Sequence, residues 1–371
     1  MNILFITFHG FGEANGISKK IHYQINALKE SGHHVDLCYY AVNHQDGHRK
    51  RMINNSILKD YGNNWLSKIK KRICYRSVIK FAGQNQIDFV YIRSDHNANP
   101  FTINLVTKLK EHGIKVVMEI PTYPYDQEYK EAGYREKFSL FIDKCYRYKL
   151  AKHLNAIVTF SNHDYIFNKR TIKISNGIDF SDINIKESSI VNENKINFIG
   201  VADVHYWHGY DRMIQGIGEY YQTPHTTDVY FHIVGCLGVE QELFMRIIQK
   251  YKIEKYIIFY GPKHGKELDY LFNICQVGIG SLARHRSNIS NIKTLKNREY
   301  AARGIPFIYS ETDEDFDNMP YILKIPANET AINILFVLNF YNKNKFIPYE
   351  IRDSIAHLSW KKQMNKVIQS V

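Results

Sequence analysis

The most informative part of this chain reads Leu295-Lys296-Asn297-Arg298-Glu299-Tyr300-Ala301-Ala302-Arg303-Gly304-Ile305-Pro306-Phe307. It has the pattern of a helix that ends at Gly304 and is followed at once by a buried strand over 307–309. Glu299 falls inside this helix, one turn from its start. A carboxylate there can accept hydrogen bonds from two hydroxyls of a sugar, and the free amides of the first turn face any phosphate in front of the helix. A sugar and a phosphate held at one helix start indicate a nucleotide ligand.

Length and composition predict a globular protein of two domains. The chain has 371 residues, too many for one ordinary core, with 44% hydrophobic and 23% charged residues. It contains no run of about 18 apolar residues, so we expect no membrane-spanning helix. Residues 1–8 lack a basic leader and a small-residue cleavage site, and we expect them to form a first strand and not a signal peptide.

The cysteines and the net charge narrow the setting further. Cys38, Cys74, Cys145, Cys236 and Cys275 form no CxxC pair, which favours reduced cytoplasmic thiols, mostly buried, and argues against a zinc site. The net charge of +12 favours nucleic acid, an anionic membrane or phosphorylated small molecules as partners, although plain compositional drift also accounts for it.

Apolar runs typical of buried strands alternate with segments of helical period through almost the whole chain. The first helical segment has Ile17, Ile21, Ile25 and Leu28 at spacings of four, four and three. Continuous apolar runs separated by helices are typical of parallel sheets covered on both faces. The expected strands are 3–8, 35–40, 89–92, 116–120, 156–160 and 171–174 in the first half, and 196–199, 230–234, 256–260, 277–280, 307–309 and 322–325 in the second.

We therefore expect an α/β protein of two Rossmann-like, doubly wound domains that face a central cleft. The first is expected at 1–180 and the second at 190–350, with a polar linker near 176–194. The C-terminal segment 351–371 is expected to carry a short amphipathic helix, around 359–371, that crosses back to the first domain. Ligands of such sheets bind beyond the carboxyl ends of the strands.

Two loops between a strand and a helix are candidate binding sites. Asn15 and Gly16 close the glycine-containing loop after the first strand, where backbone amides can approach an anion. The loop is not GxGxxG, which argues against NAD, and a plain connecting loop is the alternative. His208 lies in the corresponding loop of the second domain and would face the cleft, unless it is a capping or packing histidine.

Further candidates surround the helix that carries Glu299. Gly235 and Gly261-Pro262 end two consecutive strands, where a glycine lets a flat base lie against the backbone, although tight turns also explain single cases. A diphosphate in front of the helix would meet several cations together with the helix amides, whereas ordinary salt bridges of a solvated loop are the alternative. These cations are Arg284, Arg286, Lys293 and Lys296.

Residues 65–80 have the pattern of a basic amphipathic helix. Such a helix suits anionic headgroups, although a basic solvent face over an ordinary core stripe is equally plausible. Nucleic acid is not expected, because no stacking platform or recognition motif lies beside it. The cations are Lys68, Lys70, Lys71, Arg72, Arg76 and Lys80, and the apolar face has Trp65, Leu66, Ile69 and Ile73.

Three motifs together resemble those of retaining glycosyltransferases of the GT-B fold, of the family 4 type. Residues 295–300 with 302–306 resemble the family signature. Ser175-Asn176-Gly177-Ile178-Asp179 is similar to its inter-domain NGID element, and 207–211 matches its KGxD position. The likeness spans the chain, and it implies a nucleotide-sugar donor in the second domain and an acceptor in the first.

The resemblance also implies roles for single residues. Glu299 would bind the donor ribose, and Gly16 would approach the donor phosphate or the acceptor from the first domain. Lys293, Thr294 and Leu295 would lie along the diphosphate. The base would be lined by Gly235, Gly261 and Pro262.

The sequence departs from the family pattern at several positions. Asn291 replaces a glutamate that contacts the transferred sugar, which implies an unusual or a deoxy sugar. His208 replaces a lysine and Ala202 an arginine, so the diphosphate would instead bind Arg284, Arg286, Lys293 or Lys296. Arg93 stands where a histidine is common, and with Glu119 it ends a strand and would face the acceptor. The candidate catalytic residues are therefore Arg93, Glu119 and His208.

The resemblance thus implies a bacterial retaining glycosyltransferase of surface polysaccharide synthesis, with a saccharide or lipid-linked acceptor and no cofactor or metal. We expect it in the cytoplasm, peripheral on the inner face of the plasma membrane through residues 65–80. A noncatalytic nucleotide-sugar sensor or subunit, and a nucleotide-sugar epimerase of the same fold, are the alternatives.

Overall fold

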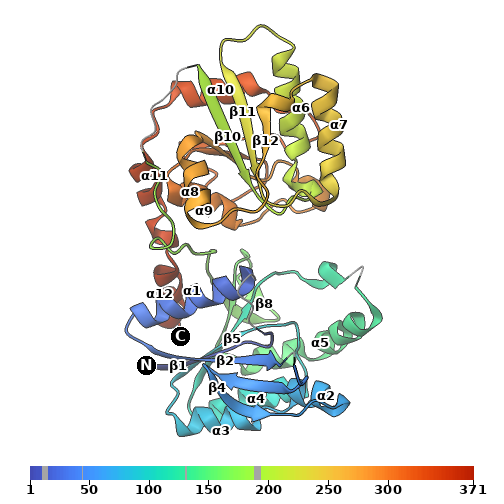
Figure 1. The fold of residues 1–371 in the computed structure, drawn as a ribbon. Coiled ribbons are helices and arrows are strands. Elements are labelled where there is room, and N and C mark those ends of the chain that lie inside the picture. Colours follow the sequence, from blue (N-terminus) through green and yellow to red (C-terminus); the bar gives the residue numbers. More distant parts are fainter. Residues whose placement is uncertain (11–15, 44, 130–131, 188–193) are drawn as a thin grey trace. The chain divides into compact units, whose positions relative to one another are not determined.

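The structure is a computed structural model that describes residues 1–10, 16–43, 45–129, 132–187 and 194–371. The chain divides into two compact units (Figure 1). Unit 1 consists of Met1–Ser175 together with Trp360–Val371, and unit 2 of Asn176–Ser359. Each unit contains one sheet, so the expected pair of α/β sheets is confirmed.

Unit 1 has a sheet with the strand order β4-β3-β2-β1-β5-β6-β7-β9-β8. The central strands from β2 to β7, and β9 beside β7, pair in parallel, whereas β3, β4 and β8 pair antiparallel with their neighbours. The strands are β1 (Asn2–Ile6), β2 (His34–Val42), β3 (Arg49–Ile53), β4 (Ser56–Asp60), β5 (Phe89–Arg93), β6 (Lys115–Ile120), β7 (Ala156–Thr159), β8 (Tyr165–Ile166) and β9 (Lys169–Lys173).

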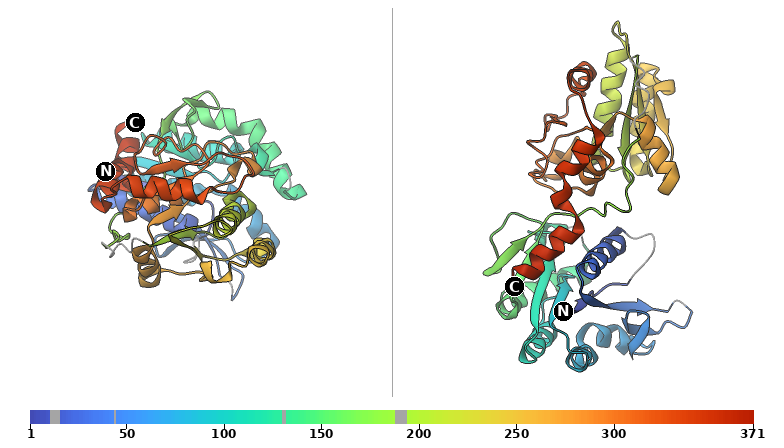
Figure 2. Two further views of the ribbon diagram at one scale, coloured as in Figure 1. Left: turned by 90° about the horizontal axis from the view of Figure 1, so that it is seen from above. Right: turned by 90° about the vertical axis from the view of Figure 1, so that its left-hand side faces the viewer.

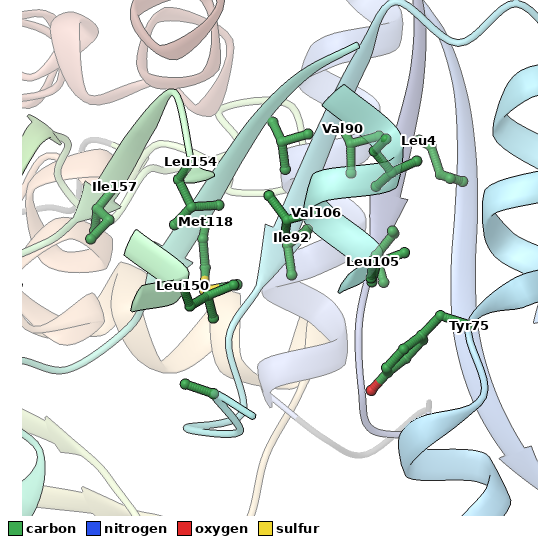
Figure 3. Packing of buried hydrophobic residues seen from close by; sticks show 14 of the residues in the cluster. Leu4, Tyr75, Val90, Ile92, Leu105, Val106, Met118, Leu150, Leu154 and Ile157 are labelled. Carbon is green, nitrogen blue, oxygen red and sulfur yellow. The ribbon is translucent and has the colours of Figure 1, made fainter. Parts of the chain in front are cut away.

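Both faces of this sheet are covered, as the continuous apolar strands predict. Ile3 and Phe5 of β1 pack on one face with helices α1 and α12, which lie side by side (Figures 1 and 2). Leu4 and Ile6 pack on the other face, in a cluster that also contains Leu105 of α4 (Figure 3). The helices are α1 (Gly16–Glu30), α2 (Trp65–Ile73), α3 (Arg76–Gln84), α4 (Pro100–Glu111), α5 (Tyr134–His153) and α12 (Trp360–Gln369), with the 3-10 turn η1 (Asp126–Tyr129).

Unit 2 has a fully parallel sheet with the strand order β12-β11-β10-β13-β14-β15. Its strands are β10 (Lys195–Val201), β11 (Asp228–Val234), β12 (Ile257–Phe259), β13 (Val277–Ile279), β14 (Phe307–Tyr309) and β15 (Ile322–Lys324). Its helices are α6 (Tyr210–Tyr221), α7 (Gln241–Tyr251), α8 (Gly265–Ile274), α9 (Leu295–Arg303), α10 (Ile334–Lys343) and α11 (Pro348–Ser354), with the 3-10 turns η2 (Tyr206–His208), η3 (Gly238–Glu240), η4 (Glu254–Tyr256), η5 (Arg284–Ser287) and η6 (Ala356–Leu358).

One expected helix is wrong in its extent. The segment 65–80 forms α2 and α3 with a break at Cys74 and Tyr75, where the Tyr75 ring is buried and its hydroxyl donates to the Arg72 carbonyl oxygen at 2.6 Å. The segment 351–371 holds the end of α11, then η6, and then α12, which begins at Trp360. The amphipathic helix expected around 359–371 is therefore present as α12.

The structure also differs from the sequence predictions in smaller features. The hairpin β3–β4 was not expected, because β4 exposes most of its side chains and so leaves no apolar run to detect. Only Cys38 and Cys275 are buried, so the expectation of mostly buried cysteines is wrong. No helix among the described residues is both long and apolar enough to cross a membrane.

Candidate functional site

The site lies at the carboxyl ends of three neighbouring strands of unit 2. β10 pairs with β11 on one side and with β13 on the other, so the strand order reverses between β10 and β13. Open parallel sheets bind their ligands at such a reversal, beyond the carboxyl ends of the strands. The loop after β10 carries His208, the loop after β13 carries Arg284, and Glu311 follows β14.

Backbone hydrogen bonds join these three loops into one assembly. The Leu282 amide donates to the His208 carbonyl oxygen at 2.9 Å, and the Ser310 amide donates to the Ser281 carbonyl oxygen at 2.9 Å. The backbones of the three loops are therefore tied to one another.

Helix α9 begins and ends as its sequence predicts. The Thr294 hydroxyl accepts a hydrogen bond from the Asn297 amide at 3.4 Å and so caps the first turn. Gly304 ends the helix with a φ of 77°, a left-handed conformation that glycine adopts without steric cost. The positive end of the helix dipole lies at Leu295, Lys296 and Asn297, where it favours an anion.

Several buried polar atoms at this place have no hydrogen-bond partner. Lys296 Nζ, Arg284 Nε and both carboxylate oxygens of Glu311 make no hydrogen bond to another residue. Buried polar groups are almost always paired, so each exception needs an explanation. Convergence of several such groups at a strand-order reversal indicates that a polar ligand completes them. Asn297 Oδ1 and Ser281 Oγ are unpaired in the same region.

The charges in this cluster favour the binding of an anion. Burial lowers the pKa of Lys296 to about 7, with the attraction of Glu311 opposing that shift and Arg284 adding to it. Burial raises the pKa of Glu311 to about 7, against a hydrogen bond from its own backbone amide and the attraction of Lys296 and Arg284. Burial also lowers the pKa of Arg284, which Glu311 partly offsets. A bound phosphate would favour the charged form of Lys296, whereas the Arg284 guanidinium is charged with or without a ligand.

His208 lies in the same cluster as a neutral hydrogen-bond donor. Burial, with Lys296 and Arg284 adding to it, lowers the pKa of His208 to about 2. Its Nδ1 accepts a hydrogen bond from the His205 amide at 3.0 Å, which places the proton of the neutral ring on Nε2. The neutral ring of His208 can therefore donate one hydrogen bond, but it is unsuited to act as a charged phosphate ligand or as a general base.

Glu299 lies on the same side of α9 as Lys296, three residues along the helix. Its Oε1 accepts a hydrogen bond from Arg303 Nε at 3.1 Å, and Arg303 NH1 in turn donates to Asp269 Oδ1 at 2.6 Å. The Glu299 side chain is 29% exposed, so it remains accessible while Arg303 fixes its orientation. A carboxylate held in this way can receive two hydroxyls of a ribose.

Other candidates from the sequence have different surroundings. Arg286 is already bound by Asp211 at 2.7 Å and Glu329 at 2.6 Å, so it braces the loop and is not an available phosphate ligand. Gly235 is explained by its own chain: it has a φ of 124°, and a Cβ there would lie 1.9 Å from the Ala202 carbonyl oxygen. Gly235 therefore does not require a base against it.

The remaining candidates from the sequence are Asn291, Lys293, Gly261 and Pro262. Asn291 is exposed, and its backbone forms a bridge with Thr312, next to Glu311. The Lys293 carbonyl oxygen accepts a hydrogen bond from Asn176 at 2.8 Å. Space beside Gly261, which precedes Pro262, is open: a Cβ at Gly261 would meet no atom within 4 Å.

In unit 1, Glu119 and Arg93 are paired with each other inside the protein. Glu119 is fully buried, binds Arg93, and accepts hydrogen bonds from the Tyr91 hydroxyl at 2.6 Å and from Gln24 at 2.7 Å. The expectation that Glu119 faces an acceptor is therefore wrong, because its buried carboxylate already binds other residues of unit 1. Of the loop after β1, Asn15 lies outside the described residues, and Gly16 begins α1.

Sequence reasoning missed Glu311. The available signal was the pattern of a polar residue soon after the buried strand Phe307–Tyr309, at the same edge as the α9 start. Parallel neighbouring strands bring such positions together, but Glu311 was not singled out because it belongs to no recognisable motif.

Comparison with solved structures shows the fold. A glycosyltransferase from Rickettsia africae superimposes with a TM-score of 0.62 at 13% identity, covering 100% of this chain and 97% of the other. Sucrose-phosphate synthase from Thermosynechococcus elongatus gives 0.61 at 13%, covering 100% and 98%. The Anabaena protein HepE, in complex with UDP and glucose, gives 0.59 at 13%, covering both chains fully. The chain thus has two Rossmann-like domains of the GT-B fold, as expected.

The same comparison includes a different enzyme class. UDP-GlcNAc 2-epimerase from Methanocaldococcus jannaschii superimposes with a TM-score of 0.52 at 10% identity, covering 100% of this chain and 99% of the other. No protein-family model matches the sequence, and no curated protein matches it. At these identities the likeness establishes architecture, and activity has to be argued from the site.

Proposed function

We propose that this chain is a glycosyltransferase that moves a sugar from a nucleotide-sugar donor to a hydroxyl of a saccharide or lipid-linked acceptor, with retention at the anomeric carbon. The observation that carries the proposal is the set of unpaired buried groups at Lys296, Arg284 and Glu311. They lie at the start of α9, at the strand-order reversal where ligands of such sheets bind.

The cluster fits the charge that develops during glycosyl transfer. As the bond between the anomeric carbon and the diphosphate oxygen breaks, negative charge grows on the leaving diphosphate. Lys296, Arg284 and the first-turn amides of α9 would stabilise that charge, and His208 would donate a neutral hydrogen bond. The acceptor oxygen forms the new bond to the same carbon, and its proton passes to a phosphate oxygen of the leaving group. These steps require no metal ion.

Glu299 is proposed as the ribose ligand and not as a nucleophile. It lies one helical turn from Lys296, so a nucleotide whose diphosphate meets Lys296 would bring its ribose toward Glu299. The fixed orientation of Glu299 beside Arg303 supports this role. We propose the open space at Gly261 as the place for the base.

The solved structures add two points about donors. HepE was solved with UDP and glucose, and Arabidopsis starch synthase IV with ADP and acarbose, so this fold holds nucleoside diphosphates in those proteins. The epimerase of the same fold keeps nucleotide-sugar epimerisation open as a second candidate. An epimerase converts its donor without an acceptor, which separates the two activities.

We further propose that unit 1 docks on an anionic membrane surface, as an enzyme with a lipid-linked acceptor requires. Helix α2 exposes Trp65, at 68%, together with Leu66 and Ile69, so this face is not a core stripe. The helix contains four cations and no acidic residue, which suits anionic headgroups. A second exposed stripe runs along α5, with Tyr134, Phe138, Phe141 and Tyr148.

The direct test combines binding and turnover. Thermal stabilisation by UDP, GDP, TDP and ADP identifies the base, and incubation with the matching nucleotide-sugars follows release of the nucleoside diphosphate with and without candidate acceptors. We expect one base to stabilise the chain and release to depend on an acceptor. Lys296→Met should reduce the stabilisation strongly, whereas Lys266→Met, which replaces an exposed lysine on α8, should leave it unchanged.

Stabilisation without turnover of any donor would favour a noncatalytic sensor, and conversion of the donor without an acceptor would favour an epimerase. Absence of stabilisation by every nucleotide would contradict the proposed function as a whole.

A further inference from the structure

Glu311 is held in place by its backbone but not through its carboxylate. The amides on either side are fixed, because Ser310 donates to the Ser281 carbonyl oxygen at 2.9 Å and Thr312 donates to the Ser290 carbonyl oxygen at 2.7 Å. The Glu311 carbonyl oxygen accepts a hydrogen bond from Lys324. The residue is only 3% exposed, yet neither carboxylate oxygen makes a hydrogen bond to another residue.

The other buried carboxylates among the described residues are paired, which makes Glu311 informative. Asp313, two residues later, is fully buried and accepts hydrogen bonds from Arg298 at 2.8 Å and from Asn297 at 3.1 Å. Glu119 in unit 1 has several internal partners. An unpaired buried carboxylate costs more than a paired one of equal burial. In the described part of the chain, Glu311 is the one carboxylate with both oxygens buried and unpaired.

Two cations and one asparagine lie near Glu311. Lys296 and Arg284 attract it from the cation side of the cluster. Asn291 runs beside it, because the backbones of Asn291 and Thr312 form a bridge. Asn291 is exposed, so the outer rim of the site runs along the backbone next to Glu311.

We propose that Glu311 binds the sugar of the donor, accepting hydrogen bonds from hydroxyls of the transferred sugar while Lys296 beside it binds the diphosphate. The inference rests on the proposed function, because it assigns the sugar part of the same donor site. A diphosphate alone leaves an acceptor-only carboxylate unpaired and repels it, whereas a hydroxylated sugar between the two supplies the missing donors.

The assignment sets the chemical class of the sugar. A carboxylate favours a neutral sugar with a free hydroxyl at the contacted position, and it disfavours a uronic acid there by charge repulsion. A deoxy sugar that lacks this hydroxyl would leave the buried carboxylate unpaired, which such sites reject strongly. Asn291, at the rim, is then a secondary contact and not the residue that selects the sugar.

The test compares Glu311→Gln with wild type for two ligands, the nucleoside diphosphate and the complete nucleotide-sugar. Calorimetric titration gives both dissociation constants, and their ratio measures what the sugar adds. We expect Glu311→Gln to bind the diphosphate within about threefold of wild type, or more tightly because a negative charge is removed. We expect it to lose at least about tenfold of the affinity added by the sugar, and most of kcat.

Donors that lack single hydroxyls make the test specific. Wild type should discriminate against the analogue deoxygenated at the contacted position, and Glu311→Gln should discriminate much less against that analogue alone. A merely structural role would not move this pattern. Glu314→Gln, an exposed neighbour in the same loop, serves as the matched control, and thermal unfolding verifies that both variants fold.

The possible failures are distinguishable. Equal weakening of diphosphate and nucleotide-sugar binding, or an unchanged ratio in Glu311→Gln, would overturn the role of Glu311 and leave the proposed function standing. A wild-type chain that binds no nucleoside diphosphate would overturn both.

Discussion

Lys296 and Glu311 lie close enough to shift each other's pKa, yet Lys296 Nζ and the two Glu311 carboxylate oxygens make no hydrogen bond to another residue. Two buried opposite charges normally pair directly, because each is costly to bury alone. Here the pair is held apart at the start of α9, at the reversal of strand order in unit 2. This arrangement is expected of a binding site whose polar groups form hydrogen bonds only with a bound ligand.

Nucleotide binding should depend on pH through Lys296. The pKa of Lys296 is lowered to about 7 without ligand, and a bound diphosphate raises it, so the affinity is full below pH 7 and falls as the pH rises above it. The loss should approach about tenfold per pH unit until the pKa of the complex is reached. Calorimetric titration from pH 6 to pH 9 measures it. In Lys296→Met the affinity is expected to be lower and its decline between pH 7 and 9 shallower, whereas an equally steep decline would argue against Lys296.

Replacement of Glu299 should weaken the binding of the donor's ribose and not that of the transferred sugar. We expect Glu299→Gln to weaken the binding of the nucleoside diphosphate by about 10-fold to 100-fold, because a charge-assisted pair of hydrogen bonds is lost. The variant should also lose the preference for the nucleoside diphosphate over its 2′-deoxy form. Glu267→Gln, an exposed glutamate on α8, is the control. If Glu299→Gln still prefers the nucleoside diphosphate over its 2′-deoxy form, the ribose binds elsewhere.

Glu119 should contribute to stability and not to chemistry. Burial by itself would raise the pKa of Glu119, but Arg93, followed by Lys20 and the hydrogen bonds from Tyr91 and Gln24, holds it below its ordinary value of 4.5. A pKa lowered in the folded state gives stability that is present above pH 4.5 and is lost as the pH falls through the folded value. Glu119→Gln should therefore cost about 3–5 kcal/mol at pH 7, since it leaves Arg93 buried without its counter-charge.

Urea unfolding at pH 7 and pH 3.5 measures this effect. The difference between wild type and Glu119→Gln should narrow at the lower pH. Glu136→Gln, an exposed glutamate in the first turn of α5, should differ little from wild type at either pH. A stable Glu119→Gln chain with abolished turnover would instead support a direct role in catalysis.

Membrane docking should require the exposed apolar residues of α2. Trp65→Ser combined with Ile69→Ser is expected to abolish flotation with vesicles that contain anionic lipid, and high salt should weaken flotation of the wild type, because the cations of α2 contribute. Phe138→Ser with Phe141→Ser tests the stripe on α5 in the same way. Self-association without flotation would identify these faces as contacts between copies of the chain.

The fold was largely predictable because its signals are local. Continuous apolar strands such as 116–120, and a helix that stops at Gly304, reflect burial and backbone geometry that each segment carries by itself. The exposed hairpin strand Ser56–Asp60 was not predictable, because it buries little. At the break near Tyr75 the buried ring contacts Phe8, a tertiary contact that no periodicity records.

The site was predictable only in part. Lys296 and Glu299 share one helix, so sequence spacing alone brings them together. Glu311 joins them through strand pairing and loop contacts, which sequence spacing does not show. Arg286 resembled Arg284 in sequence, but its ion pairs with Asp211 and Glu329 depend on the folded arrangement.

The most direct test of the account is a crystal structure of the chain with the nucleoside diphosphate that stabilises it most. The account predicts that the diphosphate lies within hydrogen-bond distance of Lys296 Nζ and the first-turn amides of α9, with a ribose hydroxyl at the Glu299 carboxylate. A nucleotide bound away from residues 293–299, with Lys296 Nζ still unpaired, would contradict it.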